Sequence, residues 1–135
     1  MTQTIVSIVA ALIRDEVGRV LLVRKRGTSA FMQPGGKRDP GEDDATALAR
    51  ELDEELGCCV ASGSLKPLGA FVAPSANEPG WMVQAAVYAV AVTGTIKARA
   101  EIEEIAWIDP AQADGLTLAP LTRDHVLPLA RLQVN

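Results

Sequence analysis

Apolar and polar positions along the chain predict a strand-rich beginning. Apolar, largely β-branched residues dominate residues 4–14 and return in residues 19–26, and the turn-forming residues 15–18 lie between the two runs. A strand that is buried on both faces has a continuous apolar run, whereas a half-exposed strand alternates. We therefore predict two strands joined as a hairpin, and the first of them is buried on both faces at its centre.

The periodicity changes to that of a helix between residues 44 and 56. Asp43 is a natural N-cap for this helix, and Gly57 is a natural stop. At about 100° per residue, the apolar side chains gather on one face around Leu52. The predicted buried stripe is Ala45, Leu48, Ala49, Leu52 and Leu56.

Three acidic side chains, Glu51, Glu54 and Glu55, fall on one flank of this helix, and the small Ala47 leaves open space among them. Like charges so placed repel each other, so a bound cation would stabilise the cluster. Carboxylate oxygens are hard ligands and favour Mg²⁺ or a similar ion. The alternative is an ordinary solvated helix face, which acid-rich helices commonly have.

The remainder of the chain alternates turns with short apolar runs. A helix follows the last run, and Pro128 within it must either kink or split that helix. The predicted strands are residues 58–62, 66–73, 81–93 and 102–108, and the predicted C-terminal helix is residues 120–133.

Several side chains outside the helix are candidates for substrate binding. Arg24 and Arg26 share one strand face and Lys25 points to the other. For each of these three basic residues, phosphate binding and simple solvation are equally favoured. Glu78 could be a ligand or base, and Trp81 could stack on a nucleobase. For both, a purely structural interpretation, as a solubilising loop acid and a core or rim aromatic, is modestly favoured.

Composition and charge restrict the class of protein. The 135 residues form one predicted domain, 48% hydrophobic and 22% charged, as in ordinary globular proteins. The net charge of −4 gives no indication of a nucleic-acid duplex or an anionic membrane as partner. A phosphorylated substrate would therefore need local cations at its site.

The cysteines and the N-terminal region indicate a cytoplasmic protein. Cys58 and Cys59 are neighbours in sequence and poorly placed to bridge to each other, which fits a reducing compartment. The apolar run from Ile5 to Ile13 is far too short to span a bilayer, and the N-terminus lacks the basic start of a signal peptide.

The loop and helix together match an extended motif. The spacing is Gly36, five residues, Glu42, seven residues, Arg50-Glu51-Leu52, one residue, Glu54-Glu55, one residue, Gly57 and a final apolar position. At every fixed position this stretch resembles the signature of the Nudix hydrolases, and it departs only at Cys58, where a larger aliphatic residue is usual. A buried free cysteine behaves as a small hydrophobe, so the departure is minor.

This resemblance implies an α/β/α sandwich around a mixed β-sheet, with the catalytic loop-helix-loop at Gly36–Cys58. It implies Mg²⁺, with Mn²⁺ as an alternative, bound by the Gly36 carbonyl and the three helix glutamates. It also implies a salt bridge between Glu42 and Arg50, although Arg50 could instead orient Glu54 one turn away. Catalytic roles are implied for Arg50, Glu51, Glu54 and Glu55, with Glu51 or Glu55 activating water; Glu101, Glu103 and Glu104 are candidates for an additional metal or water ligand.

The implied reaction is hydrolysis of a phosphoanhydride in a nucleoside diphosphate linked to another group. One candidate substrate is an oxidised nucleoside triphosphate such as 8-oxo-dGTP, which would give the monophosphate and pyrophosphate. ADP-ribose, nucleotide sugars and dinucleoside polyphosphates are alternatives, and homodimerisation is a further expectation from the family. A different class, a nucleotide-binding sensor without catalysis, is disfavoured because the set of glutamates is intact.

Overall fold

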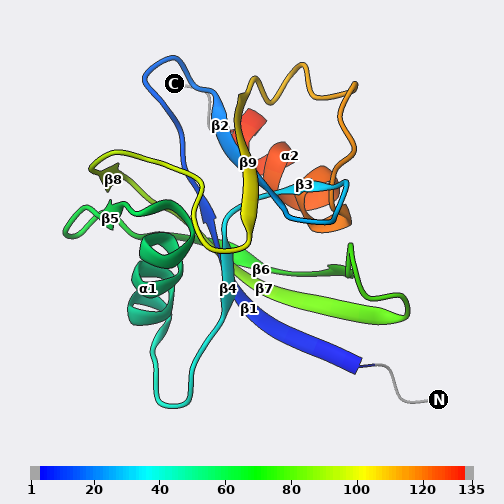
Figure 1. Ribbon diagram of the computed structural model, residues 1–135, viewed down its shortest axis with the longest axis horizontal. Coiled ribbons are helices and arrows are strands. Elements are labelled where there is room, and N and C mark those ends of the chain that lie inside the picture. Colours follow the sequence, from blue (N-terminus) through cyan, green and yellow to red (C-terminus); the bar gives the residue numbers. More distant parts are fainter. Residues whose placement is uncertain (1–3, 133–135) are drawn as a thin grey trace.

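The computed structural model describes residues 4–132, in which a four-stranded mixed sheet forms the centre (Figure 1). Its strand order is β4-β1-β7-β6. The two inner strands are parallel and stay in register from Thr4 opposite Trp81 to Leu12 opposite Ala89. The strands are β1 (Thr4–Leu12), β4 (Gly35–Lys37), β6 (Lys66–Pro74) and β7 (Trp81–Ala89).

Two smaller antiparallel sheets flank the central one. The first has the order β3-β2-β9, and the second pairs β5 with β8. The predicted hairpin is short, because β1 and β2 are bridged only near the turn, at Arg14 and Val20, before they diverge into different sheets. These strands are β2 (Val20–Lys25), β3 (Phe31–Met32), β5 (Cys59–Val60), β8 (Val92–Thr93) and β9 (Ile102–Ile108).

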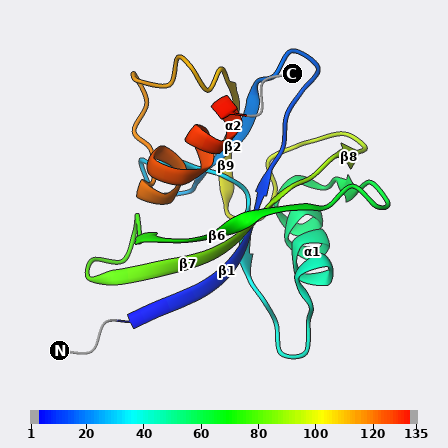
Figure 2. The same ribbon diagram turned by 180° about the vertical axis from the view of Figure 1, so that it is seen from behind.

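Helices cover both sides of the central sheet, as seen from opposite directions in Figures 1 and 2. The alternation of β1 explains this arrangement, because Val9 and Ala11 pack with helix α1 (Asp44–Leu56). Ala10 and Leu12 point to the other side, where they pack with the C-terminal helical segment. The predicted α/β/α sandwich around a mixed sheet is confirmed.

The long strand predicted over residues 81–93 is instead two strands. β7 follows β1 as far as Leu12, where the Val90 N–H donates to the Leu12 carbonyl at 3.1 Å. The chain then leaves the central sheet, and β8 pairs with β5. Val90, which lies between β7 and β8, is buried, so the sequence stays apolar where the chain changes sheets. Hydrophobicity alone therefore does not mark the end of β7.

The C-terminal helix accommodates Pro128 through a wider turn. Residues 120–132 are helical, but Thr122–Val126 (η1) has π geometry, and α2 (Leu127–Leu132) follows. The Leu127 N–H donates to the carbonyl of Thr122, five residues earlier. Residue 133, the predicted end of the helix, lies outside the described residues. Within residues 4–132, no helix has the length and apolar character required to cross a membrane.

Candidate active site

Helix α1 begins and ends as its sequence predicts. The Asp43 side chain accepts a hydrogen bond from the Thr46 N–H at 2.8 Å, and Gly57 adopts the left-handed conformation with φ of 69°. The predicted buried face was partly wrong: Ala45 is exposed, whereas Ala47 is fully buried. The apolar face is therefore rotated toward the acidic flank, and this rotation buries Glu55 as well, with only 3% of that residue exposed.

Arg50 joins the helix to the preceding loop. Its guanidinium makes two hydrogen bonds to the Glu42 carboxylate, at 2.8 and 2.7 Å, and a third to the Lys37 carbonyl at 2.9 Å. The same guanidinium lies 2.9 Å from Glu51 and 3.5 Å from Glu54. Arg50 therefore bonds closely to Glu42 and Glu51, and its contact with Glu54 is the weakest of the three.

The Glu42 carboxylate is ionised over a wide pH range as a consequence. Hydrogen bonds from the Arg50 guanidinium, together with the Asp39 N–H, lower the pKa of Glu42 to about 2. A two-pronged pairing of this kind fixes geometry as well as charge. The loop of residues 37–42 is thereby tied to the helix that carries the glutamates.

Two consecutive glycines allow the helix carboxylates to approach the β4 backbone. A Cβ atom on Gly36 would lie 2.6 Å from the carboxyl carbon of Glu51. The Gly35 N–H donates to Glu55 Oε1 at 3.2 Å. Gly35 has φ of +144°, and a Cβ atom on it would lie 2.2 Å from the Val9 carbonyl oxygen. Only glycine fits either position without displacing a carboxylate or the neighbouring strand.

Glu51 and Glu55 are two desolvated carboxylates close to one another. Burial raises the pKa of Glu55 to about 8, and the charge of Glu51 adds to this rise. Burial also raises the pKa of Glu51, against the opposing effect of the Arg50 guanidinium. Burial disfavours the ionised form of both groups, and a bound cation would oppose this effect.

The donor set suits a hard divalent cation in its chemistry. Glu51 and Glu55 offer carboxylate oxygens beside Gly36, the ligand type that Mg²⁺ prefers. The side chain of Glu54 is 53% exposed and extends toward solvent. Within residues 4–132, no three His, Cys, Asp or Glu side chains are gathered closely enough to form a metal cluster.

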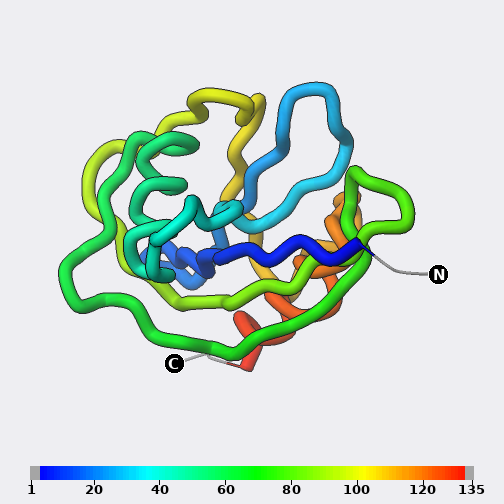
Figure 3. Tube along the Cα trace, turned by 90° about the horizontal axis from the view of Figure 1, so that it is seen from below, coloured from blue at the N-terminus to red at the C-terminus, as the bar shows by residue number. Residues whose placement is uncertain are grey.

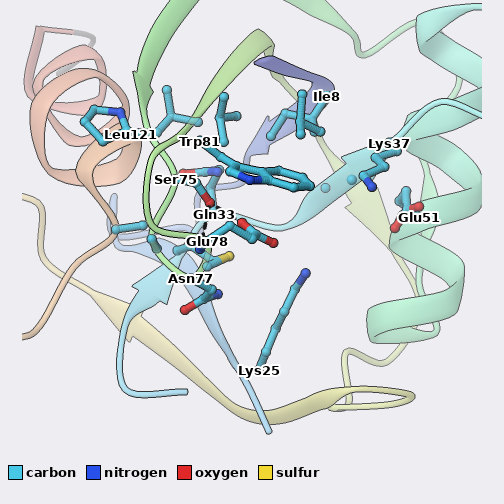
Figure 4. Close-up of a pocket in the computed structure, with 18 of the residues that line it drawn as sticks. Ile8, Lys25, Gln33, Lys37, Glu51, Ser75, Asn77, Glu78, Trp81 and Leu121 are labelled. Atoms are coloured by element: carbon cyan, nitrogen blue, oxygen red, sulfur yellow. Dashed lines mark hydrogen bonds between the residues drawn. The ribbon is translucent and has the colours of Figure 1, made fainter. Parts of the chain in front are cut away.

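A cavity of about 330 Å³ opens beside these carboxylates (Figure 4). This volume is at the lower end of the range of small-molecule pockets. The wall includes β1, β4, the first residues of β7 and the loop of residues 75–80, which lies beside the start of β1 (Figure 3). Two ammonium groups, those of Lys25 and Lys37, also belong to residues that line it.

The structure separates the other predicted site residues into two groups. Glu78, Trp81 and Glu101 line the cavity, so the first two have a place at the site that their sequence context did not favour. Arg24 and Arg26 are paired instead with Glu104, at 3.1 Å, and with Glu103, at 3.5 Å. None of these four residues lines the cavity.

Lys25, for which the sequence left phosphate binding and solvation equally favoured, lines the cavity, and sequence reasoning missed Lys37 and Gln33. For Lys25 the signal was present, because strand alternation places it opposite Arg24 and Arg26. Lys25 Nζ lies 3.7 Å from Oε1 of Glu101, another residue that lines the cavity. Lys37 follows the glycine pair directly and was identifiable by that position, whereas nothing in the local sequence singles out Gln33.

Comparison with known proteins agrees with this geometry. The family model described as the NUDIX domain matches residues 4–130, and the chain therefore belongs to the Nudix family. A MutT NUDIX hydrolase from Burkholderia pseudomallei has a crystal structure that matches with a TM-score of 0.73 and 25% identity, covering 98% of this chain and 100% of that one.

Two curated relatives match parts of the chain. An 8-oxo-dGTP diphosphatase of Haemophilus influenzae is 38% identical over 69 residues, which are 48% of this chain and 51% of the relative. The Nudix hydrolase YvcI of Bacillus subtilis is 29% identical over 104 residues, 76% of this chain and 65% of the relative. The matches thus span about half and just under two thirds of these relatives' lengths.

Proposed function

We propose that this protein is a MutT-like pyrophosphohydrolase that cleaves a nucleoside triphosphate, with 8-oxo-dGTP as a candidate, into the monophosphate and pyrophosphate. The observation that carries the proposal is the pair of desolvated carboxylates, Glu51 and Glu55, packed against Gly35 and Gly36 at one side of a ligand-sized cavity. The similarity to the 8-oxo-dGTP diphosphatase of Haemophilus influenzae supports a triphosphate substrate.

The residues that would hold the metal are Glu51, Glu55 and the Gly36 carbonyl, and Glu54, on the exposed flank of the same helix, is a further candidate ligand. Mg²⁺, or Mn²⁺ in its place, would supply neutralisation of phosphate charge and acidification of water when bound. Arg50 holds Glu51 in place through its 2.9 Å contact. The ammonium groups of Lys25 and Lys37 offset phosphate charge, which the net charge of −4 otherwise repels.

The reaction needs no covalent nucleophile. Water adds its oxygen to one phosphorus of the α–β anhydride, the bridging oxygen leaves with the other phosphorus, and the proton of water passes to a carboxylate. Glu51 and Glu55 are the candidates for that proton acceptor, because both face the cavity. Arg50 acts as a positioning residue, since its guanidinium is fully engaged by carboxylates and the Lys37 carbonyl.

A substrate screen tests the proposal. Nucleoside triphosphates, 8-oxo-dGTP, ADP-ribose, nucleotide sugars and diadenosine polyphosphates are incubated with Mg²⁺, Mn²⁺ or EDTA, and phosphate is measured after a coupled pyrophosphatase or phosphatase. We expect metal-dependent turnover of a triphosphate. Turnover of only ADP-ribose, a nucleotide sugar or a dinucleoside polyphosphate would refute the triphosphate assignment and identify that compound as the substrate. Nucleotide binding without turnover would indicate a sensor.

Glu54→Gln provides the matched variant. The side chain is half exposed, so we expect an unchanged melting temperature but a loss in kcat/KM of about 100-fold or more if it completes the metal site. Glu104→Gln is the control, because Glu104 lies outside the cavity and pairs with Arg24. Wild-type turnover by Glu54→Gln would contradict its assignment as a metal ligand.

A cytoplasmic setting completes the proposal. Cys58 is a buried free thiol and Cys59 an exposed one. A reducing compartment keeps such thiols free.

A further inference from the structure

One buried amide in the cavity wall has an unused donor. Gln33 is only 6% exposed, and its Oε1 accepts a hydrogen bond from Thr122 Oγ1 at 2.6 Å. Within residues 4–132, Gln33 Nε2 has no hydrogen-bond partner. Every fully buried side-chain nitrogen and oxygen in that range does have a partner, so Nε2 is not fully buried. The Nε2 atom therefore reaches open space, and Gln33 lines the cavity.

The hydrogen bond from Thr122 sets the orientation of the Gln33 amide. Thr122 is completely buried, and it is the first residue of the π segment that precedes Pro128. Because Thr122 occupies the amide oxygen, the side of Gln33 that faces the cavity carries N–H groups. Gln33 thus offers a hydrogen-bond donor of fixed direction.

A carboxylate from a short loop lines the same cavity. The loop is closed by hydrogen bonds from the Ser75 N–H to the Trp81 carbonyl at 2.9 Å and from the Trp81 N–H to the Glu78 carbonyl at 3.1 Å. The Ser75 hydroxyl also donates to Glu78 Oε2. No ion pair to Glu78 is formed by the part of the chain that the structure describes, so the carboxylate keeps acceptor capacity for a ligand.

An aromatic side chain lines the same cavity. Figure 4 shows the indole of Trp81 extending across the pocket, with Gln33 and Glu78 on one side and Lys37 and Glu51 on the other. Trp81 is 39% exposed, which is high for so large an apolar side chain. An exposed indole in a cavity is a stacking surface for a planar base.

The hydrogen-bonding pattern distinguishes among the bases. The Gln33 N–H groups can donate to a carbonyl of the base, and the Glu78 carboxylate can accept from two adjacent N–H donors. Guanine presents this order along one edge, as its 6-carbonyl, N1–H and 2-amino groups. Adenine and cytosine present an amino donor next to a ring-nitrogen acceptor, the reverse order. Uracil has a second carbonyl, which would face the carboxylate. A polar group of the base that meets no complementary partner in the cavity reduces the binding free energy.

We propose that Gln33, Glu78 and Trp81 form a subsite that selects guanine nucleotides by this edge of the base. The proposal rests on the proposed nucleotide hydrolase function, because that function places the phosphates at Glu51 and Glu55. Thr122 is a positioning residue in this subsite. Since 8-oxoguanine has the same edge, the subsite accepts both the normal and the oxidised base.

Binding measured without turnover tests the subsite independently of catalysis. Affinities of the wild-type protein for GDP, IDP, ADP and UDP are determined by calorimetry in EDTA. We expect GDP to bind at least about tenfold more tightly than ADP or UDP, with IDP between them because it lacks the 2-amino group. Equal affinity for all four nucleotides would overturn the proposal.

Two variants identify the residues responsible. Glu78→Gln and Gln33→Met should each reduce GDP affinity about tenfold or more and leave ADP affinity nearly unchanged. Glu103→Gln, outside the cavity and paired with Arg26, is the control and should match the wild type. If Gln33→Met fails to fold, Glu78→Gln still decides, because Glu78 lies in an exposed loop. Unchanged GDP preference in Glu78→Gln would refute the assignment.

Kinetic outcomes separate this proposal from the proposed function. Guanine-selective binding without hydrolysis of any nucleotide would support the subsite and reject the enzyme. Hydrolysis with equal kcat/KM for all bases would support the enzyme and reject the subsite. With hydrolysis present, Glu78→Gln should reduce kcat/KM for dGTP and 8-oxo-dGTP alike; a loss confined to 8-oxo-dGTP would show that another edge of the base is recognised.

Discussion

Replacing Gly36 by alanine should remove activity while leaving the fold intact. The new Cβ would lie 2.6 Å from both the carboxyl carbon and Oε2 of Glu51. Ordinary contacts between such atoms are about 3.5 Å or longer, so the carboxylate must withdraw by about 1 Å. Gly36 is not among the glycines with positive φ, so alanine is compatible with the backbone itself.

We expect Gly36→Ala to impair catalysis rather than folding, because the group that the new Cβ meets is the carboxylate at the end of the flexible Glu51 side chain. We expect the free energy of unfolding to change by less than about 1 kcal/mol. A displacement of about 1 Å at a catalytic group can reduce the rate about 100-fold. The measurements are kcat/KM for metal-dependent triphosphate hydrolysis and thermal unfolding followed by circular dichroism.

Gly35→Ala is the contrasting variant, since its Cβ would meet the Val9 carbonyl oxygen at 2.2 Å and its φ is +144°. Backbone strain and overpacking together should cost about 2–6 kcal/mol of stability. Gly115→Ala, where a Cβ meets nothing within 4 Å, is the neutral control. Wild-type kcat/KM in Gly36→Ala would refute the requirement for the Glu51 carboxylate at this position.

Two further predictions concern stability. Glu42→Gln should lower the free energy of unfolding above about pH 5, and its difference from the wild type should shrink toward pH 2. The reason is that the pKa of Glu42 is lowered in the folded state, so the ionised carboxylate stabilises the fold and this stabilisation is lost on acidification. A pH-independent difference in chemical denaturation would contradict this. Leu52→Ala should cost about 2–5 kcal/mol because Leu52 is fully buried in the core beneath α1; a loss below 1 kcal/mol in urea unfolding would show that the packing there is loose.

The local sequence determined the loop-helix unit almost completely. Asp43 and Gly57 mark its ends through hydrogen bonding and backbone conformation within a few residues, so these features can be read without a tertiary structure. The pairing of Glu42 with Arg50 was expected from the resemblance to the Nudix signature, and the structure contains it. The direction of the buried face could not be read in the same way, because positions 45 and 47 are both alanine and only packing in the folded protein buries Ala47.

Tertiary structure decided which distant residues share the cavity. Gln33 and Thr122 are 89 positions apart, and their hydrogen bond requires the C-terminal helix to pack behind β3 and β4. The same long-range pairing placed Glu103 opposite Arg26, outside the cavity. Periodicity gives the face of a residue on its own element, but it does not state what that face meets. The sequence therefore specified by itself the loop-helix unit that we propose holds the phosphates, whereas the folding of separate segments onto one sheet brought together the residues of the proposed base subsite.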